Sequence, residues 1–69
     1  MKYIVLELQT NNDNVSTVVT QHDTLPEAEQ KYHQVLMYAA VSNVEYHGAM
    51  LMNSQGAVYK QECYNHPAE

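Results

Sequence analysis

Residues 24–41 read TLPEAEQKYHQVLMYAAV, and this stretch decides the fold. Thr24 and Glu27 have the spacing of a capping box, and Pro26 falls in the first turn, so a helix is predicted to begin here. Apolar side chains then recur at intervals of three and four residues, the pattern of a helix that packs on a sheet. These side chains are Leu25, Ala28, Tyr32, Val35, Leu36, Ala39 and Ala40. We expect the helix to end at about Val41, before Ser42 and Asn43.

The segments before and after this helix are predicted to be strands. Residues 2–10 alternate in polarity, and residues 15–22 are rich in β-branched side chains. Residues 11–14 read NNDN and favour a hairpin turn. Residues 44–52 and 57–64 predict two further strands joined by a tight turn, and Gly48 indicates a bulge or a close backbone approach.

These segments predict an α+β fold of ββαββ order, in which one helix packs on one face of a four-stranded antiparallel sheet. Residues 1–64 are expected to form a single domain, and residues 65–69 a flexible C-terminal tail. A chain of 69 residues buries little surface, and domains of this size usually add a disulfide, a metal or a partner subunit. Its single cysteine, Cys63, excludes an intramolecular disulfide.

Charge and hydropathy exclude several classes of partner. Eight acidic residues against three basic ones give a net charge of −5, which makes binding to DNA or RNA unfavourable. We find no signal peptide and no apolar stretch long enough to cross a bilayer, so we expect no membrane partner and a cytoplasmic location.

One helix covers one face of such a sheet, and the other face must meet water or another protein. With Ile4, Leu6 and Leu8 directed at the helix, Tyr3 and Val5 point away from it. The C-terminal half of the helix also carries apolar side chains off its main stripe. We therefore expect a homo-oligomer, a dimer or higher, since self-association is the remaining way to stabilise the domain. The predicted interface residues are Tyr3, Val5, Met37, Tyr38, Val41 and Leu51.

The sequence offers little catalytic chemistry. Cys63 and His66 have the spacing of half a zinc site, but no second pair of ligands is present, so we expect neither a metal nor another cofactor. Strand alternation places Cys63 inward with Ala57 and Tyr59, which disfavours a thiolate nucleophile. The chain has no glycine-rich phosphate loop and no G-x-S-x-G motif, and we expect it not to be an enzyme. A ligand pocket between subunits is instead expected to use Lys31, His33, His47, Tyr64 and His66.

Most of the chain resembles a group of short proteins from phages and prophages of gut Firmicutes. The stretches that carry the resemblance are MKYIVLELQTN, AEQKYHQVL, AAVSNVEYHGAMLM and KQECYNH. The resemblance implies a protein that acts on the host cell by binding, including inhibition of its antiviral defence. Such an inhibitor either covers a host protein surface or sequesters a nucleotide immune signal between subunits.

Two other functional classes remain open at this point. One is a structural or regulatory small phage protein whose role is self-assembly. The other is an enzyme that depends on a metal or on the Cys63 thiol. The leading prediction is a non-enzymatic, homo-oligomeric binding protein.

Overall fold

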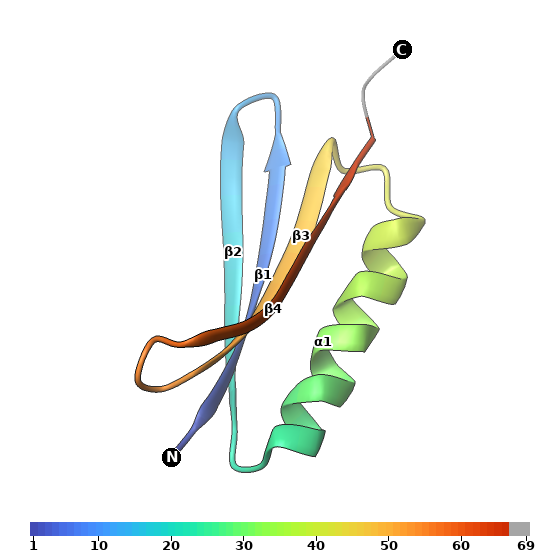
Figure 1. The fold of residues 1–69 in the computed structure, drawn as a ribbon. Coiled ribbons are helices and arrows are strands. Elements are labelled where there is room, and N and C mark those ends of the chain that lie inside the picture. Colours follow the sequence, from blue (N-terminus) through green and yellow to red (C-terminus); the bar gives the residue numbers. More distant parts are fainter. Residues whose placement is uncertain (67–69) are drawn as a thin grey trace.

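The computed structural model describes residues 1–66. Its four strands and single helix follow the predicted ββαββ order and are shown in Figure 1. Their bounds are Tyr3–Asn11 for β1, Asn14–His22 for β2, Leu25–Ala40 for α1, Tyr46–Asn53 for β3 and Val58–Asn65 for β4.

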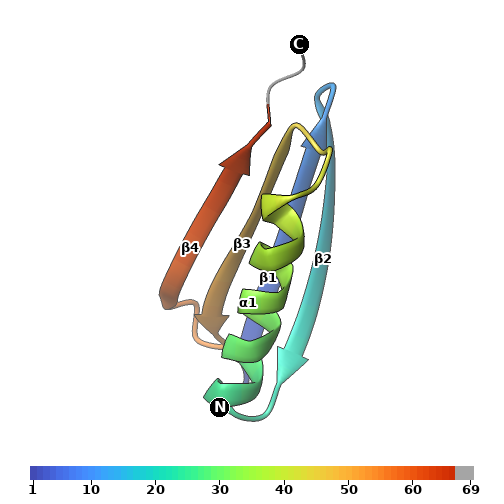
Figure 2. The ribbon, with the colours of Figure 1, turned by 90° about the vertical axis from the view of Figure 1, so that its right-hand side faces the viewer.

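The strands form one antiparallel sheet in the order β2-β1-β3-β4. Two hairpins, β1–β2 and β3–β4, therefore lie side by side and are joined by the pairing of β1 with β3. The helix lies on one face of the sheet only (Figure 1). In the view of Figure 2 it runs in front of β1 and β3, with β2 and β4 to either side. The predicted fold class is confirmed.

Local signals explain both ends of the helix. The Thr24 hydroxyl accepts a hydrogen bond from the Glu27 N–H at 3.4 Å, as the capping box predicts. At the other end Val41 is the cap residue, and the Ser42 N–H donates to the Ala39 carbonyl at 3.3 Å. The helix thus uses the start and stop positions that its sequence indicates.

The turns are also encoded locally. Asn12 and Asp13 have φ angles of 53° and 66°, the left-handed conformation that a two-residue hairpin of type I′ requires. Asn and Asp tolerate this conformation better than other side chains except glycine. In the second hairpin, Gly56 has a φ of 93°, and the Asn53 side-chain oxygen accepts from the N–H groups of Gln55 and Ala57. Both hairpin turns therefore follow from their residues.

The hydrophobic core lies between the helix and the middle strands. Its buried members are Val5, Ala28, Tyr32, Val35, Leu36, Ala49 and Leu51. Tyr3, Leu25 and Tyr64 pack against this cluster while remaining partly exposed. The helix therefore buries most of the stripe predicted for it, except that Leu25 is only partly buried and Ala40 is exposed.

The expected orientation of β1 is wrong. Val5 and Leu51 are 1% and 0% exposed and lie under the helix, and Tyr3 packs against the same core. Ile4, Leu6 and Leu8 consequently point to the other face, because successive side chains in a strand alternate. Val5 and Leu51 are thus core residues of the subunit, and Tyr3 lies partly exposed beside them on the helix side, so none of the three belongs to the face opposite the helix.

Two smaller expectations also change, for Cys63 and for the start of the tail, and the expectation for Gly48 is confirmed. Cys63 is exposed and does not pack inward. The β-bulge lies between Leu51 and Met52, whereas Gly48 shows the close approach: a Cβ there would lie 2.8 Å from the Glu62 carbonyl oxygen. Asn65 ends β4, and the next residue is hydrogen-bonded to Glu45, so the predicted tail does not begin at residue 65. Residues 67–69 of that tail lie outside the described part.

Candidate functional site

The face of the sheet opposite α1, here called the uncovered face, is the first candidate site. Strand registers place on it alternate residues of all four strands. They are Ile4, Leu6, Leu8, Thr10, Val15, Thr17, Val19, Gln21, Tyr46, Gly48, Met50, Met52, Val58, Gln61, Cys63 and Asn65. In Figure 1 this face is on the side of the sheet away from the helix.

The uncovered face is apolar and carries no charge. The charged residues within the four strands are Glu7, Lys60 and Glu62, and all three lie on the helix side. Large apolar side chains are instead open to solvent on the uncovered face: Val15 is 65% exposed and Val19 is 56% exposed. A charge-free apolar surface of this kind is typical of a protein contact.

A hollow of about 340 Å³ lies in the middle of this face. It is lined by Leu6, Leu8, Gly48, Met50, Gln61 and Cys63, together with Ala49 and Glu62, whose side chains point to the helix side of the sheet. Gly48 contributes to the hollow because it places no side chain beside its neighbours on β1 and β4. The Cys63 thiol lies at the edge, and its Sγ contacts the Tyr64 carbonyl oxygen at 3.6 Å.

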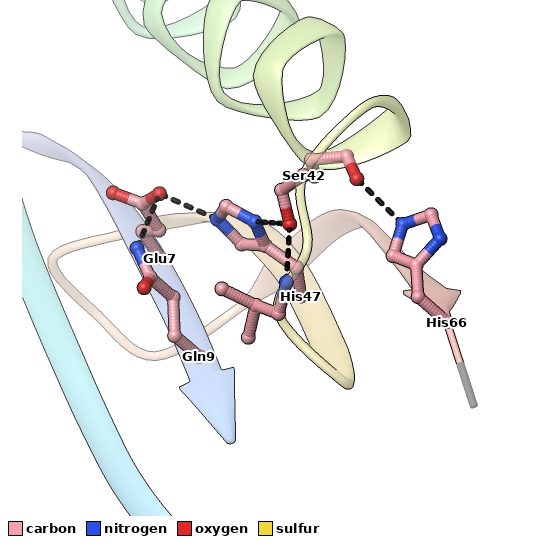
Figure 3. Close-up of polar contacts among 7 residues, drawn as sticks. Glu7, Gln9, Ser42, His47 and His66 are labelled. Atoms are coloured by element: carbon pink, nitrogen blue, oxygen red, sulfur yellow. Dashed lines mark hydrogen bonds and ion pairs between the residues drawn. The ribbon is translucent and has the colours of Figure 1, made fainter. Parts of the chain in front are cut away.

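A buried polar network on the opposite side of the sheet is the second candidate site (Figure 3). The His47 Nε2 lies 2.6 Å from the Glu7 carboxylate, and its Nδ1 lies 3.0 Å from the Ser42 hydroxyl. Gln9 donates to the same Glu7 oxygen at 3.2 Å. His47 is only 4% exposed, so this network lies in the interior beneath the end of the helix.

The partners determine the hydrogen-bond directions in neutral His47. The Glu7 carboxylate accepts, so Nε2 carries the proton and Nδ1 accepts from the Ser42 hydroxyl. The Ser42 oxygen in turn accepts from the Val44 N–H at 3.1 Å. A hydroxyl, an imidazole and a carboxylate in this order resemble an activated nucleophile. Here the hydroxyl also fixes the connection between α1 and β3, and the network joins that connection to β1.

Sequence reasoning missed Glu7 and Ser42 as members of this network. Glu7 is separated from His47 by 40 residues and approaches it only through the β1–β3 register. The alternation of β1 was the available signal, because it places Glu7 and Val5 on the same face. Alternation alone does not show which face of β1 meets the helix, so it could not by itself bring Glu7 to His47.

Three of the five predicted ligand residues gather at one end of the fold. His47 is paired with Tyr64 across β3 and β4, and the rings of Tyr64 and His66 stack at 6.3 Å. The His66 Nε2 donates to the Ala39 carbonyl at 2.8 Å, and its backbone N–H donates to Glu45 at 2.6 Å. The polar groups of His66 and His47 are thus engaged within the subunit, which fixes this end of the helix on the sheet.

The other two predicted ligand residues lie on the helix. His33 is exposed, and its ring meets the edge of Tyr32 at 5.6 Å between centroids, while Lys31 is half-buried. His33 borders a separate hollow on the outer side of α1, together with Gln30, Gln34 and Met37. The structure therefore does not bring the five residues into one pocket.

The remaining predicted interface residues are exposed on the helix. Met37, Tyr38 and Val41 are 62%, 59% and 81% exposed. They lie on the helix and its cap, on the side of the sheet that α1 occupies, so they do not adjoin the uncovered face. The two apolar surfaces of the subunit are thus distinct.

Two of the three lysines are paired with carboxylates. Lys2 contacts Asp23, and this hydrogen bond together with the lysine charge lowers the pKa of Asp23. Lys60 contacts Glu29 at 3.3 Å. Burial raises the pKa of Tyr32, and the nearby charge of Glu62 acts in the same direction.

In residues 1–66 no group of three or more histidine, cysteine and carboxylate side chains is placed to hold an ion. Cys63 belongs to the uncovered face, whereas the His66 ring reaches the helix, so the C-x-x-H pair does not converge. Across the same residues, α1 is too short and too polar to span a membrane. No family model, curated protein or solved structure matches the chain.

Proposed function

We propose that the chain is a non-enzymatic binding protein that works as a homo-oligomer, with the uncovered face as its self-association surface. The orientation of β1 carries this proposal. The strand directs Ile4, Leu6 and Leu8 away from the helix, and it places Glu7 and Gln9 beneath the helix. Burying an aliphatic side chain contributes about 1.5–3 kcal/mol. A subunit that stayed monomeric would therefore be more stable with Ile4, Leu6 and Leu8 under the helix than with Glu7 and Gln9 there.

A second copy of the chain is the occupant that fits the uncovered face. Each chain has a net charge of −5, so two copies repel one another over most of their surfaces. The uncovered face is the broad surface on which they can meet without burying a charge, since Glu7, Lys60 and Glu62 all lie on the other side. Two sheets that pack in this way form a sandwich, with their inner side chains in contact.

The oligomeric state tests this proposal. Sedimentation or native mass spectrometry at micromolar concentration is expected to show an oligomer, and a 7.9 kDa monomer would contradict it. Leu8→Lys places a charge on the uncovered face at a side chain that is already 36% exposed, so the subunit tolerates it and the oligomer dissociates. Val41→Lys, at a residue 81% exposed on the other side, is the matched control and leaves the oligomer intact. Circular dichroism verifies that both variants are folded.

In its most specific form, we propose that the oligomer inhibits a host antiviral defence in the host cell cytoplasm by binding a host protein. The resemblance to phage proteins supports the context. The engagement of Lys2 by Asp23 and of Lys60 by Glu29 favours a protein target over a nucleotide signal, because a phosphate site needs cations that are free to converge. Native mass spectrometry of protein purified from cells discriminates the two, since a retained nucleotide adds mass to the oligomer. Oligomers without added mass support the protein target.

A further inference from the structure

The edge strand β2 differs from ordinary sheet edges. Residues 14–22 read NVSTVVTQH, without a lysine, an acidic residue or a proline. The register of β2 with β1 is continuous from Asn11 opposite Asn14 to Tyr3 opposite His22, so no bulge interrupts it. Natural proteins protect exposed edges with charges, prolines or bulges, because an unprotected edge pairs with other strands.

The other edge of the sheet has this protection. β4 carries Lys60 and Glu62, and its pairing with β3 shifts register between Leu51 and Met52. The two edges are therefore unequal, and only β2 presents a regular, uncharged strand for pairing. An edge that is open at β2 and protected at β4 favours a closed pair of subunits over an open-ended chain of them.

The hairpin turn determines which backbone groups of β2 are free. A two-residue type I′ turn makes Asn11 and Asn14 a hydrogen-bonded pair, and such pairs alternate with non-hydrogen-bonded ones along antiparallel strands. Ser16, Val18 and Thr20 therefore bond to β1. The alternate residues of β2 direct their N–H and C=O groups outward: Val15, Thr17, Val19 and Gln21.

We propose that β2 pairs antiparallel with β2 of a second copy, about a two-fold axis that passes through Val18. In this register Thr17 lies opposite Val19 of the partner subunit, and Val15 lies opposite Gln21 of the partner subunit, so the outward backbone groups bond to one another. Val18 is 48% exposed and meets its own counterpart at the axis. Pairs of β-branched side chains opposite each other contribute about 0.2–1 kcal/mol each.

A second copy suits this edge better than an unrelated strand, because the register is its own complement. Every residue from 14 to 22 finds a partner, and no charged side chain meets another across the axis. The helix does not obstruct the approach: Figure 2 shows α1 over β1 and β3, with the outer side of β2 clear. The two-fold axis is perpendicular to the sheet, so both helices lie on the same side.

The pairing merges two sheets into one and doubles the uncovered face. This inference rests on the proposed function, in which that face packs on another copy. Two different self-contacts, one along the β2 edge and one across the uncovered face, together close a four-chain assembly of dihedral symmetry.

Disulfide cross-linking tests the proposed register between the two copies of β2. Val18→Cys in a Cys63→Ser background places the two thiols opposite each other at a non-hydrogen-bonded pair, where the Cα atoms lie about 4.5 Å apart and a disulfide can form. Mild oxidation is expected to cross-link most of the protein as dimers. Ser16→Cys in the same background is the matched control, because the proposed register separates its two copies by about 13 Å, and it should remain uncross-linked.

The failures of the two proposals are distinguishable. An oligomer in which Val18→Cys cross-links no better than Ser16→Cys overturns the β2 pairing and leaves the proposed function standing. A monomer by sedimentation overturns both. Val18→Lys adds an independent measurement: it places like charges together at the axis but lies on the helix side of the sheet, so it is expected to halve the mass of the assembly. An unchanged mass in folded Val18→Lys also overturns the pairing.

Discussion

Glu7→Gln tests whether the buried network stabilises the fold. The Glu7 and His47 side chains are 19% and 5% exposed, and their nearest atoms lie 2.6 Å apart. A hydrogen bond to a charged group contributes about 1.5–3 kcal/mol, and a bond between neutral groups about 0.5–1.5 kcal/mol. Gln keeps the shape of Glu and can still accept the bond, so we expect the free energy of unfolding to fall by about 1 kcal/mol.

Glu7→Ala removes the acceptor altogether and leaves the His47 N–H buried without a partner. The expected loss is about 2–3 kcal/mol, because an unsatisfied buried donor retains its full desolvation cost. A domain of this length has about 0.05–0.15 kcal/mol of stability per residue, so this loss is a large fraction of the total. The double variant with His47→Ala should then lose less than the sum of the single losses, since it removes both partners.

Urea denaturation followed by circular dichroism measures these losses. All variants are compared at one protein concentration, because self-association adds to the apparent stability. Glu62→Gln is the matched control: it removes the same charge from an exposed position on the same side of the sheet, and it should change the free energy by less than about 0.5 kcal/mol. If Glu7→Gln proves as mild as this control, or stabilises the protein, the network does not contribute to stability as argued.

Three further changes test other parts of the fold. Leu51→Ala deletes a side chain that is 0% exposed and should cost about 2–5 kcal/mol in urea denaturation, whereas a loss below 1 kcal/mol would place Leu51 outside the core. Gly48→Ala should lower the free energy of unfolding by about 1–2 kcal/mol, because the new Cβ lies 2.8 Å from the backbone of β4 and this repulsion exceeds the gain from a less flexible unfolded chain. A variant as stable as the parent, or more stable, would show that β4 shifts freely. Burial raises the pKa of the Tyr32 hydroxyl in the folded state. The neutral hydroxyl therefore stabilises the fold below the unfolded pKa of about 10, and this stabilisation is lost as the pH rises through the folded pKa. Denaturation between pH 8 and about 11 should therefore show a shallower loss of stability in Tyr32→Phe than in the parent, and equal slopes would contradict this assignment.

The sequence predicts those parts of the fold that depend on local chemistry. The capping box at Thr24 and Glu27 begins the helix, and the Asn12–Asp13 turn joins the first hairpin as expected. The antiparallel pairing within each hairpin follows from short connections between alternating segments, whereas the pairing of β1 with β3 does not, because β2 and α1 lie between them in the chain. The caps, the turns and the two hairpins need no knowledge of residues that are far apart in the chain.

The orientation of β1 could not be obtained in the same way. Alternation defines two sets of side chains but does not say which set faces the helix, and hydrophobicity alone predicts that the more apolar set does. The structure has the opposite orientation, because Glu7 and Gln9 belong to a network beneath the end of the helix that His47 and Ser42, which follow the helix in the sequence, complete. With this orientation Val5 and Leu51 lie in the core and Cys63 is exposed, contrary to expectation.

The candidate ligand residues show the same limit. His47, Tyr64 and His66 come together because β3 pairs with β4 and because His66 reaches back to the end of the helix. Lys31 and His33 stay on the helix, apart from this group. Residue type alone selected all five, whereas strand register decides which of them are neighbours.

The strand order has a consequence for folding kinetics. Each hairpin joins strands that are adjacent in sequence, and isolated hairpins form within about 1–10 μs. The pairing of β1 with β3 is long-range, because it brings Thr10 opposite Tyr46 and Tyr3 opposite Asn53. It can form only when the intervening β2 and α1 are enclosed in a loop of the chain. Non-local pairing of this sort slows folding, because the entropy of loop closure is lost before the contacts form. We therefore expect the two hairpins to form before β1 pairs with β3. The rate of the β1–β3 pairing then determines how long the aliphatic side chains of the sheet stay exposed to water during folding.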